Sequence, residues 1–244
     1  MATNVAGQTA LLIGATGQTG RHLLRELLNS PKYNRVLEAG RRVTPQDQLP
    51  QGARDKLEQR VVNFEKLDDA RLDEGPGFDV IYITLGTTRK DAGSAENFER
   101  IDRQYVVNAA KAAKVDRNQR LIYLSSPAAD PKSRFLYTRS KGLTEKSLSE
   151  LGYRDTIFFH PGLLYRSEPR LMEAMVTPFV RVLSLFTNSL AIKVEDLARS
   201  MRIAGTLGSN NLPAFAQASK AHFGDNEFTV IGNAGSFALS KGNV

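Results

Sequence analysis

Short apolar runs of strand length recur along the chain, and stretches with helical periodicity separate most of them. The apolar runs predict strands at Thr9–Ile13, Arg35–Ala39, Gln59–Asn63, Asp79–Leu85, Arg120–Ser125 and Asp155–His160. The intervening patterns predict helices at Arg21–Leu28, Asp68–Gly77, Glu96–Ala113 and Thr138–Leu151. Regular alternation of strands and helices indicates a parallel sheet that is covered by helices on both faces.

Beyond His160 this alternation weakens. Helical patterns at 169–186 and 194–207 come first, and a strand–helix piece from Glu227 to Ser240 follows. With 244 residues, of which 41% are hydrophobic, the chain can bury one substantial core. We therefore predict a single α/β domain over residues 1–244, with its core at about 7–165 and a small C-terminal, substrate-side part at about 166–244.

Composition excludes several classes of function. The chain has no cysteine, which rules out disulfides, thiolate metal sites and cysteine nucleophiles. Its three histidines are scattered, so we expect no metal site. The net charge is +7, but no Lys/Arg run exceeds two residues. This spread predicts a solvated basic surface and no nucleic-acid partner.

Neither the start of the sequence nor its longest apolar stretch predicts a membrane anchor. A strand pattern begins at Thr9 and leaves no room for a secretory signal. Glu173 and Arg181 interrupt the apolar stretch from Leu171 to Leu190, which argues against a membrane span. That stretch is compatible with a protein partner or a membrane-surface contact, although burial in the core is the simpler explanation. We expect a cytoplasmic protein with at most peripheral membrane association.

A glycine-rich turn follows the first predicted strand and opens the first predicted helix. Gly14 permits the tight turn, Gly17 lets the backbone approach a pyrophosphate, and Gly20 permits close helix–strand packing. The helix N-terminus then offers N–H groups and a positive dipole end to the phosphates. An ordinary glycine-rich connection is the alternative. The context favours a Rossmann-type dinucleotide site that includes Gly14, Thr16, Gly17, Gln18, Thr19 and Gly20.

The end of the second predicted strand distinguishes NAD from NADP. An NAD enzyme typically places a carboxylate there, on the ribose 2′-hydroxyl. In this chain Glu38 lies too early, and Gly40 is followed by Arg41 and Arg42. Guanidinium groups suit a 2′-phosphate through charge-assisted hydrogen bonds. The segment therefore predicts NADP(H), with a solvated arginine pair as the alternative.

Three further segments are expected to contact the cofactor, because ligands bind outside the carboxyl ends of the strands. They follow the third, fourth and sixth predicted strands, and their residues are Asn63 and Phe64, then Leu85, Gly86, Thr87 and Thr88, then Pro161 and Gly162. The first segment is placed to flank the adenine. The second passes near the ribose and pyrophosphate, and the third offers backbone groups to the nicotinamide amide.

Tyr137 and Lys141 lie four residues apart in a predicted helix, so they share one helix face. A lysine ammonium beside a phenol lowers the phenol pKa from about 10 and favours proton exchange with a carbonyl or alcohol near neutral pH. Lys141 can also bind the nicotinamide ribose. We therefore expect Tyr137 and Lys141 to contact the cofactor as well as the substrate. The preceding strand ends in Ser125 and Ser126, where a hydroxyl can hydrogen-bond a substrate oxygen as it gains charge. We predict Ser126, Tyr137 and Lys141 as catalytic residues, with Ser125 as the alternative to Ser126.

Two other polar residues are weaker candidates. Asp102, in the helix after the fourth strand, is compatible with a proton relay or equally with a surface ion-pair network. His160, at the end of the sixth strand, is interpreted as structural rather than catalytic.

With these motifs in this order, the chain resembles the short-chain dehydrogenase/reductases. More closely, it resembles the atypical branch that contains the mammalian Tat-interacting, oxidoreductase-like tumour suppressor and its fungal mitochondrial outer-membrane relatives. Matching segments are 40–42, 62–69, 85–89, 101–106, 125–133, 135–137 and 160–162. The resemblance implies NADPH binding and the catalytic roles of Ser126, Tyr137 and Lys141. It also implies a peripheral position on the mitochondrial outer membrane.

The resemblance has limits that bear on function. His160 stands where relatives commonly carry an arginine, and the region beyond Tyr165 matches only loosely. Fold and cofactor transfer well, whereas substrate choice does not. We predict an NADPH-dependent oxidoreductase that acts on a carbonyl or alcohol of a small molecule. The alternatives are a non-enzymatic NADPH-binding factor with a protein partner, and an isomerase or epimerase that retains NADP.

Overall fold

The computed structural model describes residues 7–165 and 191–242. An eight-stranded sheet with the order β3-β2-β1-β4-β5-β6-β10-β9 crosses the molecule. All neighbouring strands in this sheet are parallel except β9 and β10, which are antiparallel. The strands are β1 (Gln8–Ile13), β2 (Tyr33–Gly40), β3 (Leu57–Val61), β4 (Val80–Ile83), β5 (Arg120–Leu124), β6 (Asp155–His160), β9 (Ser219–Phe223) and β10 (Asn226–Gly232).

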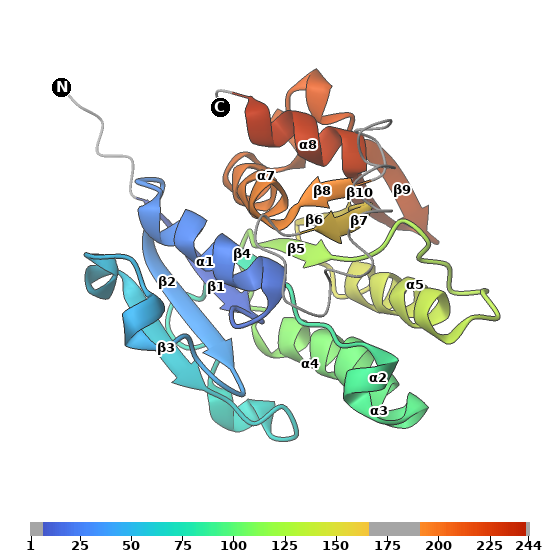
Figure 1. Cartoon of the computed structure of the whole chain (residues 1–244), viewed down its shortest axis with the longest axis horizontal. Coiled ribbons are helices and arrows are strands. Elements are labelled where there is room, and N and C mark those ends of the chain that lie inside the picture. Colours follow the sequence, from blue (N-terminus) through green and yellow to red (C-terminus); the bar gives the residue numbers. More distant parts are fainter. Residues whose placement is uncertain (1–6, 166–190, 243–244) are drawn as a thin grey trace.

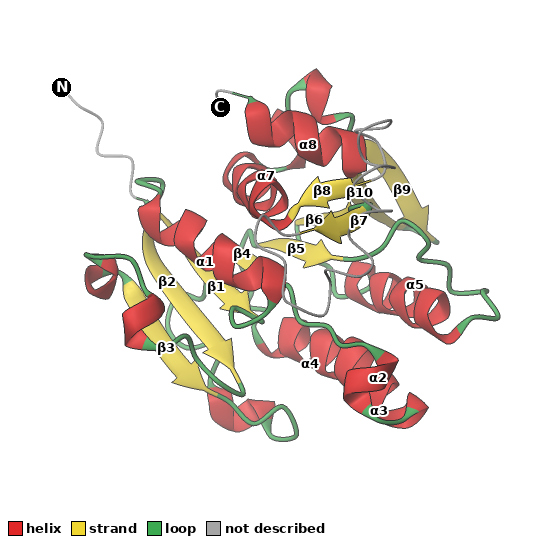
Figure 2. Ribbon diagram, viewed as in Figure 1, coloured by secondary structure: helices red, strands yellow, loops and turns green. Residues whose placement is uncertain are grey.

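Helices cover both faces of the sheet (Figures 1 and 2). One face carries α1 (Gln18–Asn29), α7 (Val194–Leu207) and α8 (Asn233–Lys241), and the other carries α4 (Tyr105–Ala112) and α5 (Leu136–Ser149). Alternate strand residues serve the two layers, because successive side chains point to opposite faces. In β1, Leu12 packs under the first layer and Leu11 under the second, and both are fully buried. The predicted Rossmann-type α/β fold is confirmed.

The predicted strands are all present, with small shifts at their ends. The largest shift is in β3, which begins and ends two residues before the predicted Gln59–Asn63. Its pairing with β2 ends where Gly40 faces Val61, and the Asn63 side chain then accepts a hydrogen bond from the Glu65 N–H at 3.0 Å. This bond turns the chain away from the sheet.

The predicted helix at Asp68–Gly77 is wrong. A single 3₁₀ turn, Leu67–Ala70, forms there and ends at Arg71, which has a left-handed φ of 46°. Gly75 and Gly77 also have positive φ values, so this backbone cannot continue as a right-handed helix. The predicted helix at 169–186 and the apolar stretch 171–190 lie outside the described residues.

The predicted helix Glu96–Ala113 forms, but it contains a π-helical turn. α3 (Ala95–Glu99) runs into the π turn Arg100–Gln104 and then into α4. This turn leaves Asp102 1% exposed. The expectation that Asp102 belongs to a surface ion-pair network is therefore wrong. π turns inside helices often mark functional sites.

The C-terminal part completes the core and one helix layer. α7 crosses the sheet beside α1, and a β-carbon at Gly205 of α7 would lie 1.9 Å from the Tyr82 hydroxyl. That hydroxyl is hydrogen-bonded to Tyr33 at 2.7 Å, and Tyr33 reaches Thr206 at 3.1 Å. A small parallel pair, β7 (Leu163–Tyr165) and β8 (Ala191–Lys193), lies beside the main sheet. Both hydrophobic clusters of the core thus contain residues from 7–165 and from 191–242.

Candidate functional site

A cavity of about 730 Å³ opens at the carboxyl ends of the central strands. The strand order reverses between β1 and β4, which is where open α/β sheets form their ligand crevice. Segments that follow β1, β4, β5 and β6 line the cavity, together with four side chains from the neighbouring helices. The segments are 17–19, 84–88, 124–127 and 161–164, and the side chains are those of Asp91, Asp102, Tyr137 and Lys141.

The glycine turn has the close contacts that its spacing predicts. Gly14 has a φ of 92°, and a β-carbon there would lie 2.7 Å from the Leu85 backbone nitrogen. A β-carbon on Gly20 would lie 2.1 Å from the Gly14 carbonyl oxygen. Neither position tolerates a side chain, because real β-carbons do not approach backbone atoms this closely. The turn therefore brings the start of α1 against the ends of β1 and β4.

The start of α1 fits a phosphate. Its N-cap, Gly17, provides no side-chain hydrogen bond, and the first turn contains no acidic residue. The first N–H groups of the helix thus have no side-chain cap, and Gly17, Gln18 and Thr19 face the cavity. Unpaired N–H groups and the positive dipole end form a ready anion site. The turn and the cavity volume together fit a dinucleotide.

Lys141 is held inside the cavity wall by two partners from other elements. Its Nζ donates to the Tyr123 hydroxyl of β5 at 2.9 Å and lies 3.2 Å from Asp102 Oδ2 in the π turn. The other Asp102 oxygen accepts the Thr87 N–H at 3.3 Å. An ammonium group has three donors, and only the bond to Tyr123 is a hydrogen bond, because the contact with Asp102 Oδ2 is an ion pair without hydrogen-bond geometry. Donors of Lys141 thus remain for Tyr137 or a ligand.

Burial by itself would lower the pKa of Lys141, but its neighbours outweigh that effect. Tyr123, Asp102 and Tyr137 together raise the pKa above its ordinary value. Burial raises the pKa of Tyr123, so that phenol is neutral near pH 7. Asp102 is the carboxyl group that pairs with the buried ammonium.

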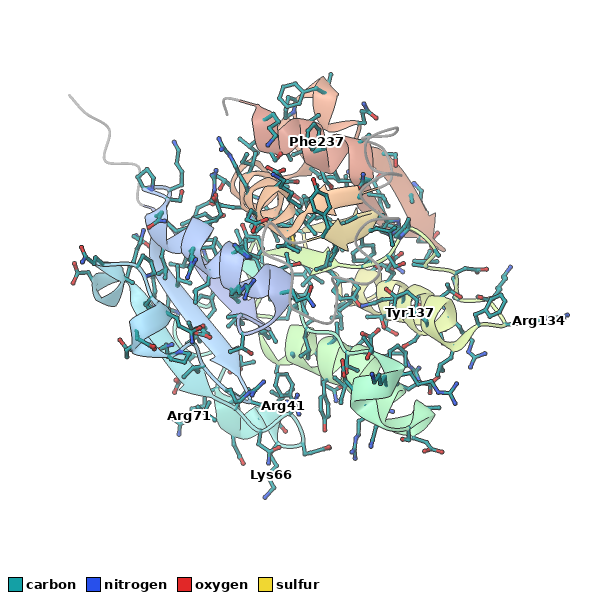
Figure 3. All side chains as sticks on the ribbon, viewed as in Figure 1. Arg41, Lys66, Arg71, Arg134, Tyr137 and Phe237 are labelled. Atoms are coloured by element: carbon teal, nitrogen blue, oxygen red, sulfur yellow. The ribbon has the colours of Figure 1, made fainter. Side chains whose placement is uncertain are left out.

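Neither the Tyr137 hydroxyl nor the Ser126 hydroxyl donates a hydrogen bond to any residue that the structure describes. Tyr137 is 47% exposed, and its ring lies 6.3 Å from that of Phe98 with a tilted geometry. The Ser126 hydroxyl oxygen accepts a long bond, 3.4 Å, from the Ala128 N–H, which leaves its own proton available. Tyr137 is labelled in Figure 3; it lies in the first turn of α5 and lines the cavity. Both hydroxyls are thus available to a ligand in the cavity.

Ser125 belongs to a different network. Its hydroxyl donates to Glu145 Oε1, and the same oxygen lies 2.7 Å from His160 Nε2. Glu145 lies one turn after Lys141 in α5 and is 3% exposed. The network joins the ends of β5 and β6 to α5, which agrees with a structural role for His160. The sequence places Glu145 on the same helix face as Lys141, which marks it as a residue near the site. It does not indicate that Ser125 and His160 are its partners.

Twelve of the predicted site residues line the cavity. They are Gly17, Gln18, Thr19, Leu85, Gly86, Thr87, Thr88, Ser126, Tyr137, Lys141, Pro161 and Gly162. No described residue after Leu164 does so, although substrate contacts were expected from the C-terminal part. Gly14, Thr16 and Gly20 belong to the same turn as Gly17.

The remaining predicted cofactor residues lie at the carboxyl ends of β2 and β3. Arg41 and Arg42 are exposed, and Figure 3 shows Arg41 beyond the end of β2. Asn63 is exposed, whereas Phe64 is 4% exposed and its ring stacks on Tyr105 at 5.2 Å. The Phe64 ring is thus committed to the core, and its place beside the adenine stays a prediction.

Residues 7–165 and 191–242 contain neither a metal-binding cluster nor a membrane-spanning helix. No group of three or more His, Asp or Glu residues in these ranges is arranged to hold a metal ion. No helix in the same ranges has the length and apolar character that a membrane crossing requires.

Comparison of the sequence with known proteins gives a consistent result. A family profile described as NAD(P)H-binding matches residues 14–174. Protein HTATIP2 of Rattus norvegicus is 36% identical over 197 residues, which cover 80% of this chain and 79% of that protein. The mitochondrial protein fmp52 of Emericella nidulans is 34% identical over 186 residues, covering 73% of this chain and 77% of that protein.

Solved structures share the architecture at much lower identity. MoeE5, solved with UDP-glucose and NAD, has a TM-score of 0.60 and 17% identity, and the match covers 83% of this chain and 73% of that one. The Bordetella bronchiseptica enzyme WbmF, solved with NAD⁺, has a TM-score of 0.59 and 14% identity, covering 82% and 70%. At these identities the likeness shows the fold.

Proposed function

The chain belongs to the NAD(P)H-binding family, with HTATIP2 and the fungal FMP52 proteins among its relatives, and we propose that it is an NADPH-dependent oxidoreductase. Its substrate is a small molecule with a carbonyl or alcohol group. The observation that carries the proposal is the buried ammonium of Lys141, which Asp102 and Tyr123 hold in the cavity wall one helical turn from Tyr137. A protonated lysine in that place suits proton transfer by the tyrosine.

Tyr137 is the proton donor in the reductive direction. Its hydroxyl gives a proton to the substrate carbonyl oxygen as that oxygen gains charge, and it takes the proton back in the oxidative direction. The Lys141 ammonium stabilises the resulting phenolate, because the two side chains lie on one face of α5. Asp102 keeps the ammonium in one position during this exchange.

Ser126 orients the substrate. The Ser126 hydroxyl, whose proton is not donated elsewhere, donates a hydrogen bond to the substrate carbonyl oxygen. This bond strengthens as negative charge develops on that oxygen. Ser125 is less suited to this role, because its proton is donated to Glu145.

The start of α1, the glycine turn and the arginine pair after β2 would hold the cofactor. The N–H groups of Gln18 and Thr19, which have no side-chain cap, suit the pyrophosphate, and Arg41 and Arg42 suit a 2′-phosphate. NADPH bound there supplies the hydride. The preference for NADPH over NADH rests on the two guanidinium groups.

The test is the Tyr137→Phe variant, with a panel of aldehydes and ketones and with NADPH absorbance as the readout. Loss of the proton donor should lower kcat by about 10²- to 10⁴-fold and change the Kd of NADPH far less than kcat. Tyr153→Phe is the matched control, because that buried hydroxyl bonds the Ala110 carbonyl and does not line the cavity. Its turnover should equal that of the wild type.

Three results would contradict the proposal. Equal turnover by Tyr137→Phe and wild type would remove the role of the tyrosine. Tight NADPH binding by the wild type with no turnover of any substrate would indicate a non-enzymatic binding protein. Product formation without net NADPH consumption would indicate an isomerase.

A further inference from the structure

Glu38 is an acidic residue in the middle of a buried strand. It is 0% exposed in β2, where its neighbours Leu37 and Ala39 are apolar. A carboxylate is placed in such surroundings only when its oxygens are fully hydrogen-bonded. The partners of Glu38 therefore show what it does.

The carboxylate holds the loop that follows β2. Glu38 Oε1 accepts both the backbone N–H of Thr44 at 2.7 Å and the Thr44 hydroxyl at 2.8 Å. Glu38 Oε2 accepts from Gln59 Nε2 at 2.7 Å. Gln59 lies opposite Glu38 in the β2–β3 register and donates from the same nitrogen to the Thr44 carbonyl at 2.8 Å. Thr44 is thus fixed through its N–H, its hydroxyl and its carbonyl.

The other end of the loop is fixed by the strand itself. β2 ends at Gly40, where a β-carbon would lie 2.9 Å from the Arg42 carbonyl oxygen. The chain therefore folds back tightly at Gly40 and is held again at Thr44. Arg41 and Arg42 lie between these two points.

The arginines themselves have no partner in the part of the chain that the structure describes. Both side chains are exposed, and neither guanidinium forms a hydrogen bond or an ion pair with residues 7–165 or 191–242. Figure 3 shows Arg41 extending beyond the sheet. The loop that carries these two cations is thus held at both ends, which lowers the cost of ordering it around a ligand.

We propose that Glu38 sets the preference for NADPH over NADH without touching the cofactor, because its carboxylate holds the loop that presents Arg41 and Arg42 to the 2′-phosphate. Glu38 is a positioning residue, and Thr44 and Gln59 act with it as a brace. This inference rests on the proposed cofactor, NADPH.

Charge repulsion and loop positioning predict opposite changes in 2′-phosphate affinity when Glu38 is neutralised. The direction of the measured change therefore distinguishes them. A carboxylate near a 2′-phosphate repels it, so neutralising Glu38 would tighten phosphate binding if charge were its main influence. If positioning is its main influence, neutralisation releases the loop and weakens phosphate binding. In a glutamine at position 38, one carboxylate oxygen becomes an amide nitrogen that opposes the Gln59 amide, so the brace is broken with little change of shape.

The experiment is calorimetric titration of Glu38→Gln with 2′,5′-ADP and with 5′-AMP, which differ by the 2′-phosphate. We expect the Kd of 2′,5′-ADP to rise about tenfold, as expected for a lost hydrogen bond to a charged group, and the Kd of 5′-AMP to stay within about twofold. Glu58→Gln is the control for the change of charge, because Glu58 precedes Gln59 in β3 and pairs with Arg35 at 2.9 Å and with Arg60. It should bind both nucleotides as the wild type does.

Thr44→Val is the second variant and decides the matter if Glu38→Gln does not fold. It keeps the Glu38 charge and removes only the hydroxyl of the brace, so the Kd of 2′,5′-ADP should rise by about threefold. The role of Glu38 is overturned if the Kd of 2′,5′-ADP is unchanged or lower in Glu38→Gln, or in Thr44→Val when only that variant folds. That result leaves the proposed preference for NADPH in place. If the wild type binds the two nucleotides equally, the NADPH preference is wrong, and this inference is overturned with it.

Discussion

Lys141 and the pair Arg41–Arg42 are cationic groups at the same edge of the sheet, but the fold treats them in opposite ways. Lys141 is 5% exposed and lies against Asp102 and Tyr123. The arginines are exposed, and no described residue pairs with either. Lys141 is paired within the protein before any ligand binds, whereas Arg41 and Arg42 are left free to pair with a ligand.

The difference follows from the cost of desolvating a charge. A buried ammonium must be paired at all times, so its position and its protonation are set by the fold. This suits a group that must stay charged beside a tyrosine. Exposed guanidinium groups remain hydrated, and their pairing energy is available to a ligand. The carboxyl edge of the sheet thus has one end, at Lys141, where packing fixes a buried cation, and another, beyond β2, where exposed cations stay hydrated.

The largest test of this comparison is the stability of Lys141→Met. Removal of the ammonium leaves the Asp102 carboxylate buried without its counter-ion, which should lower the free energy of unfolding by about 3–5 kcal/mol. Arg41→Met is the exposed counterpart and should change it by less than about 0.5 kcal/mol. Urea unfolding at neutral pH measures both.

A second substitution separates the lost ion pair from lost packing. Adding Asp102→Asn to Lys141→Met removes the uncompensated charge and should recover about half of the lost stability or more. Equal stability losses for Lys141→Met and Arg41→Met would remove the distinction between the two ends.

The next effect concerns binding at the exposed end. The double substitution Arg41→Ala and Arg42→Ala should weaken NADPH binding by about ten- to a hundredfold, because charge-assisted hydrogen bonds contribute about 1.5–3 kcal/mol. NADH binding should change by less than about twofold. Titration of both cofactors by fluorescence measures this, and a parallel loss of NADH affinity would mean that the arginines support the loop rather than the phosphate.

The smallest effect is the response to salt. Raising NaCl from about 0.05 to 0.5 M should weaken NADPH binding several-fold, since exposed charges are screened over a few ångströms at high ionic strength. The stability cost of Lys141→Met should change by less than about 0.5 kcal/mol over the same range, because a buried pair is screened much less. A salt-sensitive Lys141 would show that water reaches the pair.

The sequence predicts features that depend on local chain geometry. The Gly14, Gly17 and Gly20 turn and the Tyr137–Lys141 helix face are local, because each is set by spacing along one turn or one helix. The strand–helix alternation likewise identifies the fold class. These features need no knowledge of which distant segments meet.

The features that were missed depend on contacts between distant segments. Asp102 is a candidate from the sequence, but its burial is not, because Arg100 and Arg103 give the segment the character of a surface; the π turn and its contact with α5 bury Asp102 beside Lys141. Glu38 lies too early in the sequence to bind the ribose, and its role in holding the loop could not be predicted. Its hydrogen-bond partners, Thr44 and Gln59, lie six and twenty-one residues further along the chain. Strand β9 was missed because Ser219, Lys220 and His222 give an edge strand the polarity of a loop.

The packing of α7 on α1 has a consequence for synthesis of the chain. Leu24 and Leu27 of α1 are buried under a layer that includes Leu197 and Met201 of α7, and Arg202 pairs with Glu26 at 3.0 Å. Translation of the residues between α1 and α7 takes roughly 8–33 seconds at about 5–20 residues per second. During that interval the nascent nucleotide-binding half presents an uncovered apolar face outside the ribosome. We expect this half to depend on chaperones until α7 emerges and covers it.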